Sequence, residues 1–270
     1  MTETTVGKRF LALHRSGEPL LMPNAWDVGS AKLLADLGYS AIATTSSGFA
    51  ATLGRLDGSV TRDEALDHGG RLAAAVDIPV SADLEGGFAD DLDGIAETYR
   101  RAAASGLAGG SIEDFTGDRS DPIHPVERAA EQVAAAAEAA HAGGSDFVLT
   151  ARAENHLYGR NDLADTIARL QRYQEAGADV LYAPGIMAPD DVRALVTSVD
   201  RPVNVLVRPG APTVAELAEL GVARISVGGG LAFAALGSLV TAGRELLEQG
   251  TYGYWDLAGP GSEAARRAFA

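Results

Sequence analysis

The sequence Val80-Ser-Ala-Asp83-Leu-Glu85-Gly-Gly-Phe88 places two carboxylates at the end of a short β-rich run, with two glycines directly after them. Successive side chains of a strand point to opposite faces, so Asp83 and Glu85 are expected on one face. Like charges held side by side repel each other unless a cation or a shared proton relieves them, and Mg²⁺ prefers such oxygen ligands. The stretch predicts a metal site at a strand end. A surface loop that contains acids is the alternative for this stretch taken alone.

Strand-like and helix-like segments alternate on both sides of this stretch. Strands are predicted at residues 19–22, 40–45, 78–83, 109–112, 147–150, 180–183, 203–207 and 224–227, with helices between them and a last helix reaching about residue 249. Eight strand–helix repeats with short turns predict an α/β fold, a TIM-type (β/α)8 barrel that forms a single domain over residues 1–270. An open doubly wound sheet is the alternative, but the first strand lacks the glycine fingerprint that binds phosphate in such folds.

The segments outside the repeats are also informative. Residues 4–16 predict a short amphipathic helix before the barrel, and residues 49–60 are expected to form a loop. Thr61 and Glu64 have the spacing of a capping box, which predicts a helix start at that point. The C-terminal tail contains Tyr252, Tyr254 and Trp255, too many aromatic side chains for a solvated end. This tail is expected to contact a partner subunit.

The composition excludes several classes of protein. A net charge of -15 argues against nucleic acid and anionic membranes as partners. The absence of cysteine excludes disulfides, thiolate metal sites and cysteine catalysis. The only lysines, Lys8 and Lys32, lie outside the strand ends, so a Schiff-base aldolase is excluded too. The N-terminus lacks an apolar signal core and no apolar run approaches about 18 residues, which predicts a cytoplasmic protein.

Polar residues gather at the predicted carboxyl ends of the strands, where the active site of such a barrel lies. Carboxylates on adjacent strands beside one arginine suit a magnesium and oxo-acid site, because the acids bind the metal and the arginine pairs with a substrate carboxylate. The alternative for Asp114, Arg152 and Glu154 is simple ion pairing around the barrel rim. The gathered residues are Asn24, Asp27, Ser46, Ser47, Asp83, Glu85, Glu113, Asp114, Arg152, Glu154 and Asn155.

The motifs Asp83-Leu-Glu-Gly-Gly-Phe, Ile112-Glu-Asp114 and Ala151-Arg-Ala-Glu154 resemble those of the isocitrate lyase/phosphoenolpyruvate mutase superfamily. Pro23-Asn-Ala-Trp-Asp27 and Thr45-Ser-Ser-Gly48 are similar to its smaller, less characterised branch, which includes oxaloacetate decarboxylase-like proteins. The resemblance covers residues 5–248. It implies a site in which Mg²⁺, with Mn²⁺ as an alternative ion, binds a small 2-oxo acid. It also implies a homo-oligomer, a dimer of dimers, in which residues 231–270 are exchanged between subunits.

The resemblance also implies a role for each site residue. Asp83 would bind the metal, while Glu85 and Glu113 would order its water shell. The backbone around Ser47 and Gly48 would form an oxyanion-type cradle, and Arg152 would hold the reacting group. The predicted site therefore has Asp83 and Glu85 on the metal, Arg152, Glu113 and Asp57 as catalytic residues, and Trp26, Ser46, Ser47, Gly48 and Asn204 as substrate-binding residues.

These residues predict a Mg²⁺-dependent lyase that cleaves a carbon–carbon bond of a 2-oxo acid and leaves pyruvate enolate, whose charge a metal and fixed N–H donors stabilise. The superfamily's isocitrate-type lyases carry a Lys-Lys-Cys-Gly-His loop, whereas this chain has Phe115-Thr-Gly-Asp-Arg-Ser-Asp-Pro-Ile-His124, which argues against isocitrate or methylisocitrate cleavage. Its phosphonate enzymes carry histidine and serine where Ala183-Pro-Gly185 stands. The alternatives are carbon–phosphorus mutase or hydrolase chemistry, a phosphate-binding barrel enzyme that uses Gly228-Gly-Gly230, and a ligand-binding barrel without turnover.

Overall fold

Nine parallel strands form one sheet at the centre of the computed structural model, which describes residues 5–270. The order of the strands in the sheet is β1-β9-β8-β7-β6-β5-β4-β3-β2. The strands are β1 (Leu20–Met22), β2 (Asn24–Ala25), β3 (Ile42–Thr44), β4 (Val80–Asp83), β5 (Gly109–Glu113), β6 (Val148–Arg152), β7 (Val180–Tyr182), β8 (Val203–Leu206) and β9 (Arg224–Ser226).

Pro23 explains how nine strands make a barrel of eight. β1 and β2 are two pieces of one barrel strand. Pro23 lies between them and has no backbone N–H to donate, so the hydrogen bonding of this strand to its neighbours is interrupted there. β1 pairs with β9 through Leu21 and Ile225, and β2 pairs with β3 through Asn24 and Ala43. The first barrel strand therefore joins the last to the second and closes the sheet. The predicted (β/α)8 barrel is confirmed.

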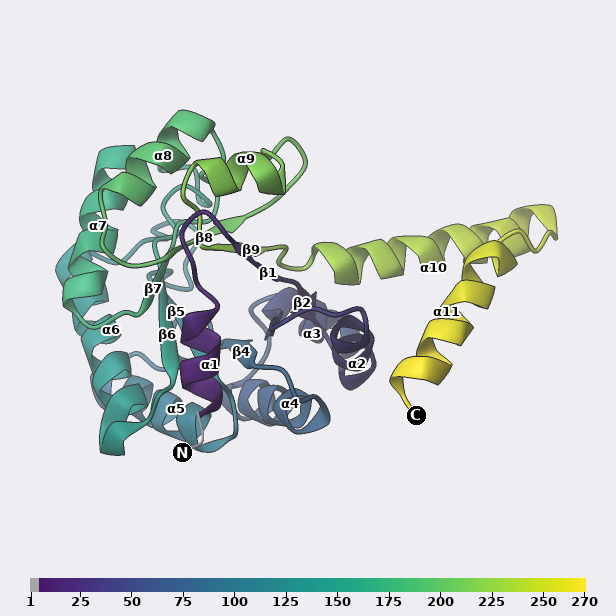
Figure 1. Ribbon diagram of the computed structural model, residues 1–270, viewed down its shortest axis with the longest axis horizontal. Helices are drawn as coiled ribbons and strands as arrows, with labels where there is room; N and C mark the ends of the chain where they lie inside the picture. The colour runs from purple at the N-terminus through teal and green to yellow at the C-terminus, as the bar shows by residue number, and fades with distance from the viewer. Residues whose placement is uncertain (1–4) are drawn as a thin grey trace.

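Helices follow the strands and surround the barrel (Figure 1). A short helix, α1, precedes β1, and a single 3-10 turn at Ala142–Gly144 follows α6. The helices are α1 (Val6–Ala12), α2 (Val28–Asp36), α3 (Ser46–Thr52), α4 (Arg62–Ala75), α5 (Leu92–Ala104), α6 (Val126–His141), α7 (Leu163–Glu175), α8 (Pro189–Thr197), α9 (Val214–Glu219), α10 (Gly230–Gln249) and α11 (Trp255–Ala268).

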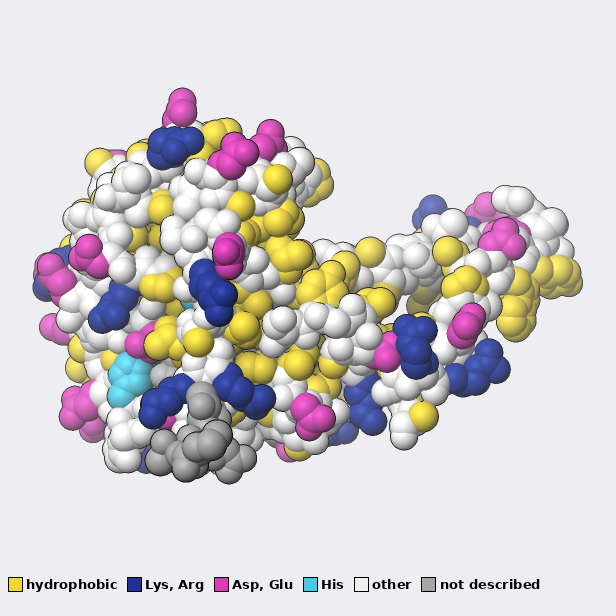
Figure 2. Space-filling model, in the orientation of Figure 1, with side chains coloured by type: hydrophobic (Ala, Val, Ile, Leu, Met, Phe, Trp, Pro, Cys, Tyr) yellow, Lys and Arg dark blue, Asp and Glu magenta, His cyan; other side chains and the backbone are white. Residues whose placement is uncertain are grey.

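The last two helices leave the barrel. α10 projects away from the sheet as an arm, and α11 turns back from the far end of this arm at an angle, toward α2 (Figure 1). Ala232 is the only buried residue of α10, whereas Leu239 is 67% exposed. Figure 2 shows hydrophobic side chains along this arm and in the notch where it leaves the barrel. α11 returns to the same subunit, where Arg267 forms an ion pair of 2.7 Å with Asp36 of α2.

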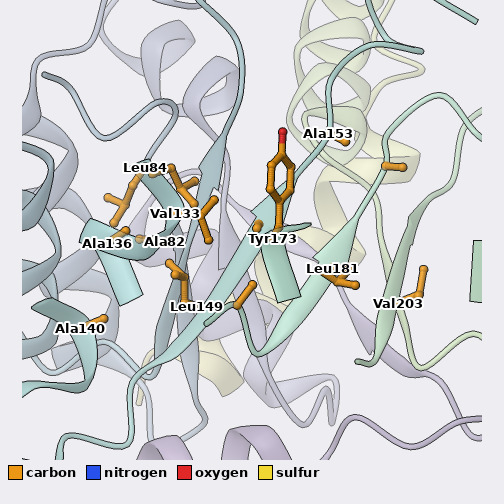
Figure 3. Close-up of a cluster of buried hydrophobic side chains, with 14 of the residues drawn as sticks. Ala82, Leu84, Val133, Ala136, Ala140, Leu149, Ala153, Tyr173, Leu181 and Val203 are labelled. Atoms are coloured by element: carbon orange, nitrogen blue, oxygen red, sulfur yellow. The ribbon is translucent and has the colours of Figure 1, made fainter. Parts of the chain in front are cut away.

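The core lies between the sheet and the surrounding helices. Leu149 of β6, Val133 of α6 and Tyr173 of α7 belong to one buried cluster, part of which Figure 3 shows. The first four residues of β6 are all buried, as expected for parallel strands that are covered on both faces. A second cluster, which includes Phe10 of α1 and Met22 of β1, contains residues from the amino-terminal ends of several strands, such as Val148 and Val180.

One local expectation needs correction, and one segment without a predicted secondary structure is helical. Residues 49–60 are not all loop, because α3 occupies Ser46–Thr52 and Thr45 caps it by accepting a hydrogen bond from the amide of Gly48 at 3.4 Å. The tail is helical as α11, although Pro260 lies inside it. Glycine and proline lower helix propensity at both places, and tertiary packing outweighs that local signal. The capping box of Thr61 and Glu64 is confirmed, while the predicted helix at 4–16 is shorter and its first residue lies outside the described residues.

His14 is a buried histidine that contacts Arg224 at the start of β9. His14 follows α1, and its Nδ1 lies 3.0 Å from the carbonyl of Phe10 while its Nε2 lies 3.2 Å from Arg224. Arg224 can only donate, so Nε2 accepts and Nδ1 carries the proton. Burial, and secondarily the nearby guanidinium of Arg224, lowers the pKa of His14 from 6.5 to about 3. The ring is therefore neutral in the folded protein at neutral pH.

This lowered pKa predicts acid sensitivity. The unfolded chain binds a proton at His14 near pH 6.5 while the folded chain does not, so the stabilisation is present above pH 6.5 and is lost as the pH falls toward 3. His14→Gln keeps an acceptor for Arg224 and does not titrate. Between pH 7 and pH 5 the wild type should lose about 2 kcal/mol of unfolding free energy relative to this variant, as measured by urea denaturation. Parallel pH curves for the two proteins would contradict the assignment.

Candidate active site

A polar cavity of about 190 Å³ opens among the barrel strands, at the end where their carboxyl termini meet. It is smaller than the cavities of about 300–1,000 Å³ that hold drug-sized ligands, so it suits a small metabolite. Its wall includes hydroxyl, amide and charged side chains from several strands and from the loops that follow them. Among these lining residues are Asp57, Asp83, Arg152, Tyr182, Asn204 and Arg224.

Arg152, the last residue of β6, organises the acidic side of this cavity. Its Nη1 lies 3.1 Å from both Asp83 Oδ1 and Glu113 Oε2, and its Nε donates to Glu154 Oε1 at 2.8 Å. Its guanidinium also lies 5.1 Å from the ring of Tyr182. The side chain is only 15% exposed, so these carboxylates hold it in one orientation. Its Nη2 makes no hydrogen bond to residues 5–270 and is available to a ligand.

Asp83, like Arg152, is held in one orientation by groups at the ends of neighbouring strands. Its backbone amide donates to Thr44 Oγ1 at 2.8 Å, and its Oδ2 accepts from the amide of Ser46 at 3.1 Å. Ser111 Oγ lies 3.4 Å from the other carboxylate oxygen. The groups that hold Asp83 come from β3, β5, β6 and the start of α3. Neighbouring strands of the closed barrel therefore determine where this carboxylate points.

Glu85 does not lie on the strand, which corrects the alternation argument. β4 ends at Asp83, and Glu85 has a left-handed backbone with φ 48°. The two side chains still meet, because both line a hollow of about 10 Å³ beside the main cavity, close to the space that one water or ion needs. Burial first, and then the charges of Asp83 and Asp57, raise the pKa of Glu85 to about 7. Burial also raises the pKa of Glu113, although Arg152 opposes this shift.

The structure places the other predicted site residues in two groups. Asp57, Ser46, Ser47 and Asn204 line the main cavity. Trp26 and Gly48 instead line an apolar hollow against α10. The amide of Gly48 is also occupied by the cap of α3, so of the predicted cradle only Ser47 reaches the cavity.

The donor set fits a hard divalent cation. Asp83, Glu113 and Glu154 contact one guanidinium, and Glu85 lines a hollow with Asp83. The buried Oε1 of Glu85 has no hydrogen-bond partner within residues 5–270. Within residues 5–270 no three acidic or histidine side chains converge as a direct metal cage. Mg²⁺ commonly keeps several waters and takes only one or two protein carboxylates, which agrees with this looser arrangement. Asp83 and Glu85 are the residues that would hold such an ion.

Comparisons with known proteins agree with this geometry. The family model for phosphoenolpyruvate phosphomutase matches residues 10–247. The chain belongs to the isocitrate lyase/phosphoenolpyruvate mutase superfamily. A crystal structure of a candidate lyase/mutase from Burkholderia cenocepacia J2315 is 49% identical, with a TM-score of 0.93 over 98% of this chain and 96% of that one.

Two curated relatives are similar over most of this chain. An uncharacterized protein of Mycobacterium tuberculosis (strain ATCC 25618 / H37Rv) is 36% identical over 81% of both chains. Oxaloacetate decarboxylase 2 of Pseudomonas putida (strain W619) is 29% identical over 82% of this chain and 74% of its own length. The predicted superfamily is confirmed, and the chain is an enzyme of lyase or mutase type. Enzymes of this superfamily bind small carboxylic acids.

The sequence did not single out several residues that line the cavity. Ser111, Thr150, Tyr182 and Arg224 all reach it from the strands. Serine, threonine and tyrosine occur in many apolar strands, so the residue types at Ser111, Thr150 and Tyr182 did not indicate a functional site. Arg224 was different, because a charged residue at the start of an otherwise apolar strand is rare unless it is paired.

Asp114 lies outside the cavity and fixes the wall behind it. It is 2% exposed and accepts hydrogen bonds from Tyr173 Oη at 2.6 Å, from Arg169 Nη1 at 3.2 Å and from the amide of Glu154 at 2.8 Å. Burial raises its pKa, although these donors oppose the shift. The rim ion-pair alternative therefore describes Asp114 correctly, because it ties β5 to α7 and positions Glu154.

Asp114→Asn should cost about 3–5 kcal/mol of unfolding free energy, because it leaves the buried Arg169 opposite a neutral amide. Asp165→Asn is the matched control. Asp165 binds the same arginine through Nε at 2.7 Å, but its side chain is 43% exposed, so about 1 kcal/mol or less is expected. Urea denaturation of the three proteins measures both values. Equal costs for the two substitutions would show that Asp114 is not the structural anchor.

Proposed function

We propose that this chain is a Mg²⁺-dependent lyase that cleaves a carbon–carbon bond of a small 2-oxo acid and leaves pyruvate enolate. The observation that carries the proposal is the Arg152 cluster: one guanidinium held by Asp83, Glu113 and Glu154 at the edge of a small polar cavity. Carboxylates exceed cations there, and a bound dication would balance them. The same surroundings leave Arg152 Nη2 available to an anionic substrate.

Each polar group then has a task that its position supports. Mg²⁺, when bound by Asp83 and Glu85, would act as a Lewis acid that polarises the 2-oxo group. Arg152 Nη2 would pair with a carboxylate oxygen of the substrate, and its other nitrogens stay fixed on their own carboxylates. Ser46, Ser47 and Asn204 would contact the bound acid from the wall. Glu113, whose pKa burial raises, and Asp57 are the candidate proton carriers.

The phosphate-binding alternative receives little support. The amides of Val227 and Gly228 both donate to Asn24 Oδ1, at 3.1 and 2.9 Å, so they do not face a ligand. A Cβ on Gly229 would come within 2.7 Å of Ser47 Oγ and of the Phe233 ring, which makes close packing a sufficient reason for glycine there. Carbon–phosphorus chemistry remains the second candidate, because the matching family model is that of phosphoenolpyruvate phosphomutase. The predicted cytoplasmic location stays a prediction.

The test is pyruvate release from a panel of small carboxylic acids: the 2-oxo acids oxaloacetate, phosphonopyruvate and 2-oxo-4-hydroxy acids, and the hydroxy acid methylisocitrate. With Mg²⁺, one carbon–carbon substrate should be cleaved, and EDTA should abolish the reaction. Asp83→Asn should lower kcat/KM by about 100-fold or more, since metal contacts contribute several kcal/mol to the transition state. Asp90→Asn removes the same charge at an exposed position and should leave the rate unchanged.

Release of phosphate from phosphonopyruvate, with no carbon–carbon cleavage, would replace the proposal with the second candidate. Binding of these acids without any turnover would instead favour the ligand-binding barrel. Activity that survives both EDTA and Asp83→Asn would contradict the metal assignment itself.

We also propose that the barrel spans the whole chain as one domain and that α10 and α11 pack on a second copy of this chain. Leu21, the outward residue of β1, is 40% exposed and lines an open groove beside α2. In a (β/α)8 barrel a helix normally covers such a strand, and here α10 points away from it. α10 is also long and apolar enough to cross a membrane, but its last turns carry Arg244, Glu245 and Glu248 and the chain returns to α2.

Light scattering should therefore give a multiple of the 27.8 kDa chain mass, with a dimer of dimers expected. Leu239→Glu should weaken association about tenfold or more, because burying a leucine contributes about 1.5–3 kcal/mol. Leu56→Glu, at an 87% exposed leucine of the 53–60 loop, is the matched control. A monomer at micromolar concentration would exclude the exchange of α10 and α11 between subunits. Recovery of the protein in the membrane fraction would indicate instead that α10 crosses a membrane.

A further inference from the structure

Arg224 is a second arginine in the cavity, and its surroundings differ from those of Arg152. It is 3% exposed and comes from the first residue of β9. Its Nε donates to Asn204 Oδ1 at 2.9 Å, its Nη2 donates to Thr150 Oγ1 at 3.2 Å, and its Nη1 lies 3.2 Å from His14 Nε2. These three partners come from β8, β6 and the segment after α1, so the guanidinium lies across the barrel interior.

None of these partners is an anion. Asn204 and Thr150 are neutral, and the lowered pKa of His14 keeps its ring neutral as well. Within residues 5–270 no carboxylate lies within ion-pair distance of Arg224, whereas Arg152 and Arg169 both have such partners. Burial lowers the pKa of Arg224 to about 9, in the direction expected for a cation without a counter-charge. A buried charge of this kind is costly unless something pairs with it.

The guanidinium still has donors to offer. Arginine carries five N–H groups, and the three contacts above account for three of them. Arg224 lines the same cavity as Arg152 and Asp83, together with Ser226 and Tyr182. A ligand in this cavity is therefore within reach of both arginines. The Arg224 guanidinium, which lacks a counter-charge and has remaining N–H donors, therefore lies where a ligand in this cavity could pair with it.

We infer that Arg224 forms a subsite for a second anionic group of the substrate, so that the enzyme acts on 2-oxo acids carrying a carboxylate or phosphonate on a short arm. This inference rests on the proposed function, in which the 2-oxo acid itself binds at Asp83 and Arg152. One end of the ligand lies at the acidic, metal-binding side of the cavity and the other end pairs with Arg224. The cavity of about 190 Å³ limits the arm to a few atoms. Arg224 thereby selects among acids that share the same 2-oxo head.

Three ligands with the same head and one methylene form a matched series: 2-oxobutyrate ends in a methyl group, oxaloacetate in a carboxylate and phosphonopyruvate in a phosphonate. Affinities come from thermal unfolding of the wild type with Mg²⁺ at increasing ligand concentration, with oxalate as a probe of the head site alone. The wild type should bind one or both dianionic members about 10–100-fold more tightly than 2-oxobutyrate, the range for hydrogen bonds to a charged group. Whichever of oxaloacetate and phosphonopyruvate shows the larger gain in affinity over 2-oxobutyrate identifies whether Arg224 prefers a carboxylate or a phosphonate.

Arg224→Gln should reduce this preference to about twofold or less, while the affinities for oxalate and 2-oxobutyrate stay as in the wild type. A structural arginine would change the melting temperature without changing the preference. Arg224→Lys keeps the charge and should keep part of the preference, which covers the case in which the glutamine variant does not fold. Arg201→Gln, at an exposed position before β8, should behave as the wild type.

Equal wild-type affinities across the series would overturn the inference, and so would a preference that survives Arg224→Gln. Failure of the proposed function gives a different result. If its 2-oxo acid site at Asp83 and Arg152 is wrong, neither oxalate nor any 2-oxo acid would bind with Mg²⁺, whatever residue stands at position 224. If only the lyase reaction is wrong, the acids would still bind but release no pyruvate.

Discussion

The charge balance around Arg152 is the constraint on which the site depends. A guanidinium that is nearly buried needs anions at fixed positions, and Asp83, Glu113 and Glu154 supply them from three different strand ends. Those strands lie side by side because β5 pairs in parallel with both β4 and β6. The two pieces of the first barrel strand on either side of Pro23 then close the sheet. Once closed, the barrel holds more negative than positive charge at one edge. Burial raises the pKa of Glu85 and Glu113, and neighbouring carboxylates raise both values further. The excess of carboxylates makes this edge suited to a dication.

Much of the fold could be predicted from the sequence, because its signals are local and repeated. The apolar strands and the capping box at Thr61 each follow from a few neighbouring residues, and the barrel follows from their alternation. The wrong loop prediction at residues 49–60 and the helix of the tail, which was not predicted, both lie where tertiary contacts outweigh local propensity. α3 forms despite Gly48, since that glycine packs against Trp26 and Ala232, where a larger residue would clash. α11 forms around Pro260 in a segment that returns to α2, which no local pattern reveals.

The site was predictable in part for a related reason. Acidic residues at the ends of β4 and β5 are conspicuous in an apolar context, so Asp83 and Glu113 could be found by position alone. The sequence could not show that Arg152 contacts three carboxylates at once, or that Glu85 turns out of the strand into a left-handed conformation. It also could not separate Trp26 and Gly48 from the cavity, because that depends on the path of α10. Distances between strand ends are properties of the closed barrel.

The two arginines of the cavity show how identical side chains acquire different tasks. Arg152 is surrounded by more negative charge than it can neutralise, so it acts as a fixed part of the acidic edge and offers one remaining nitrogen. Arg224 is more deeply buried, yet it faces amide, hydroxyl and neutral imidazole groups, so its charge is still to be balanced. A ligand that carried anions at both ends would lie along the line between an edge that needs a cation and an arginine that needs an anion. The charges that line the barrel thus give the cavity an acidic end and a basic end, and this polarity constrains which 2-oxo acids fit it.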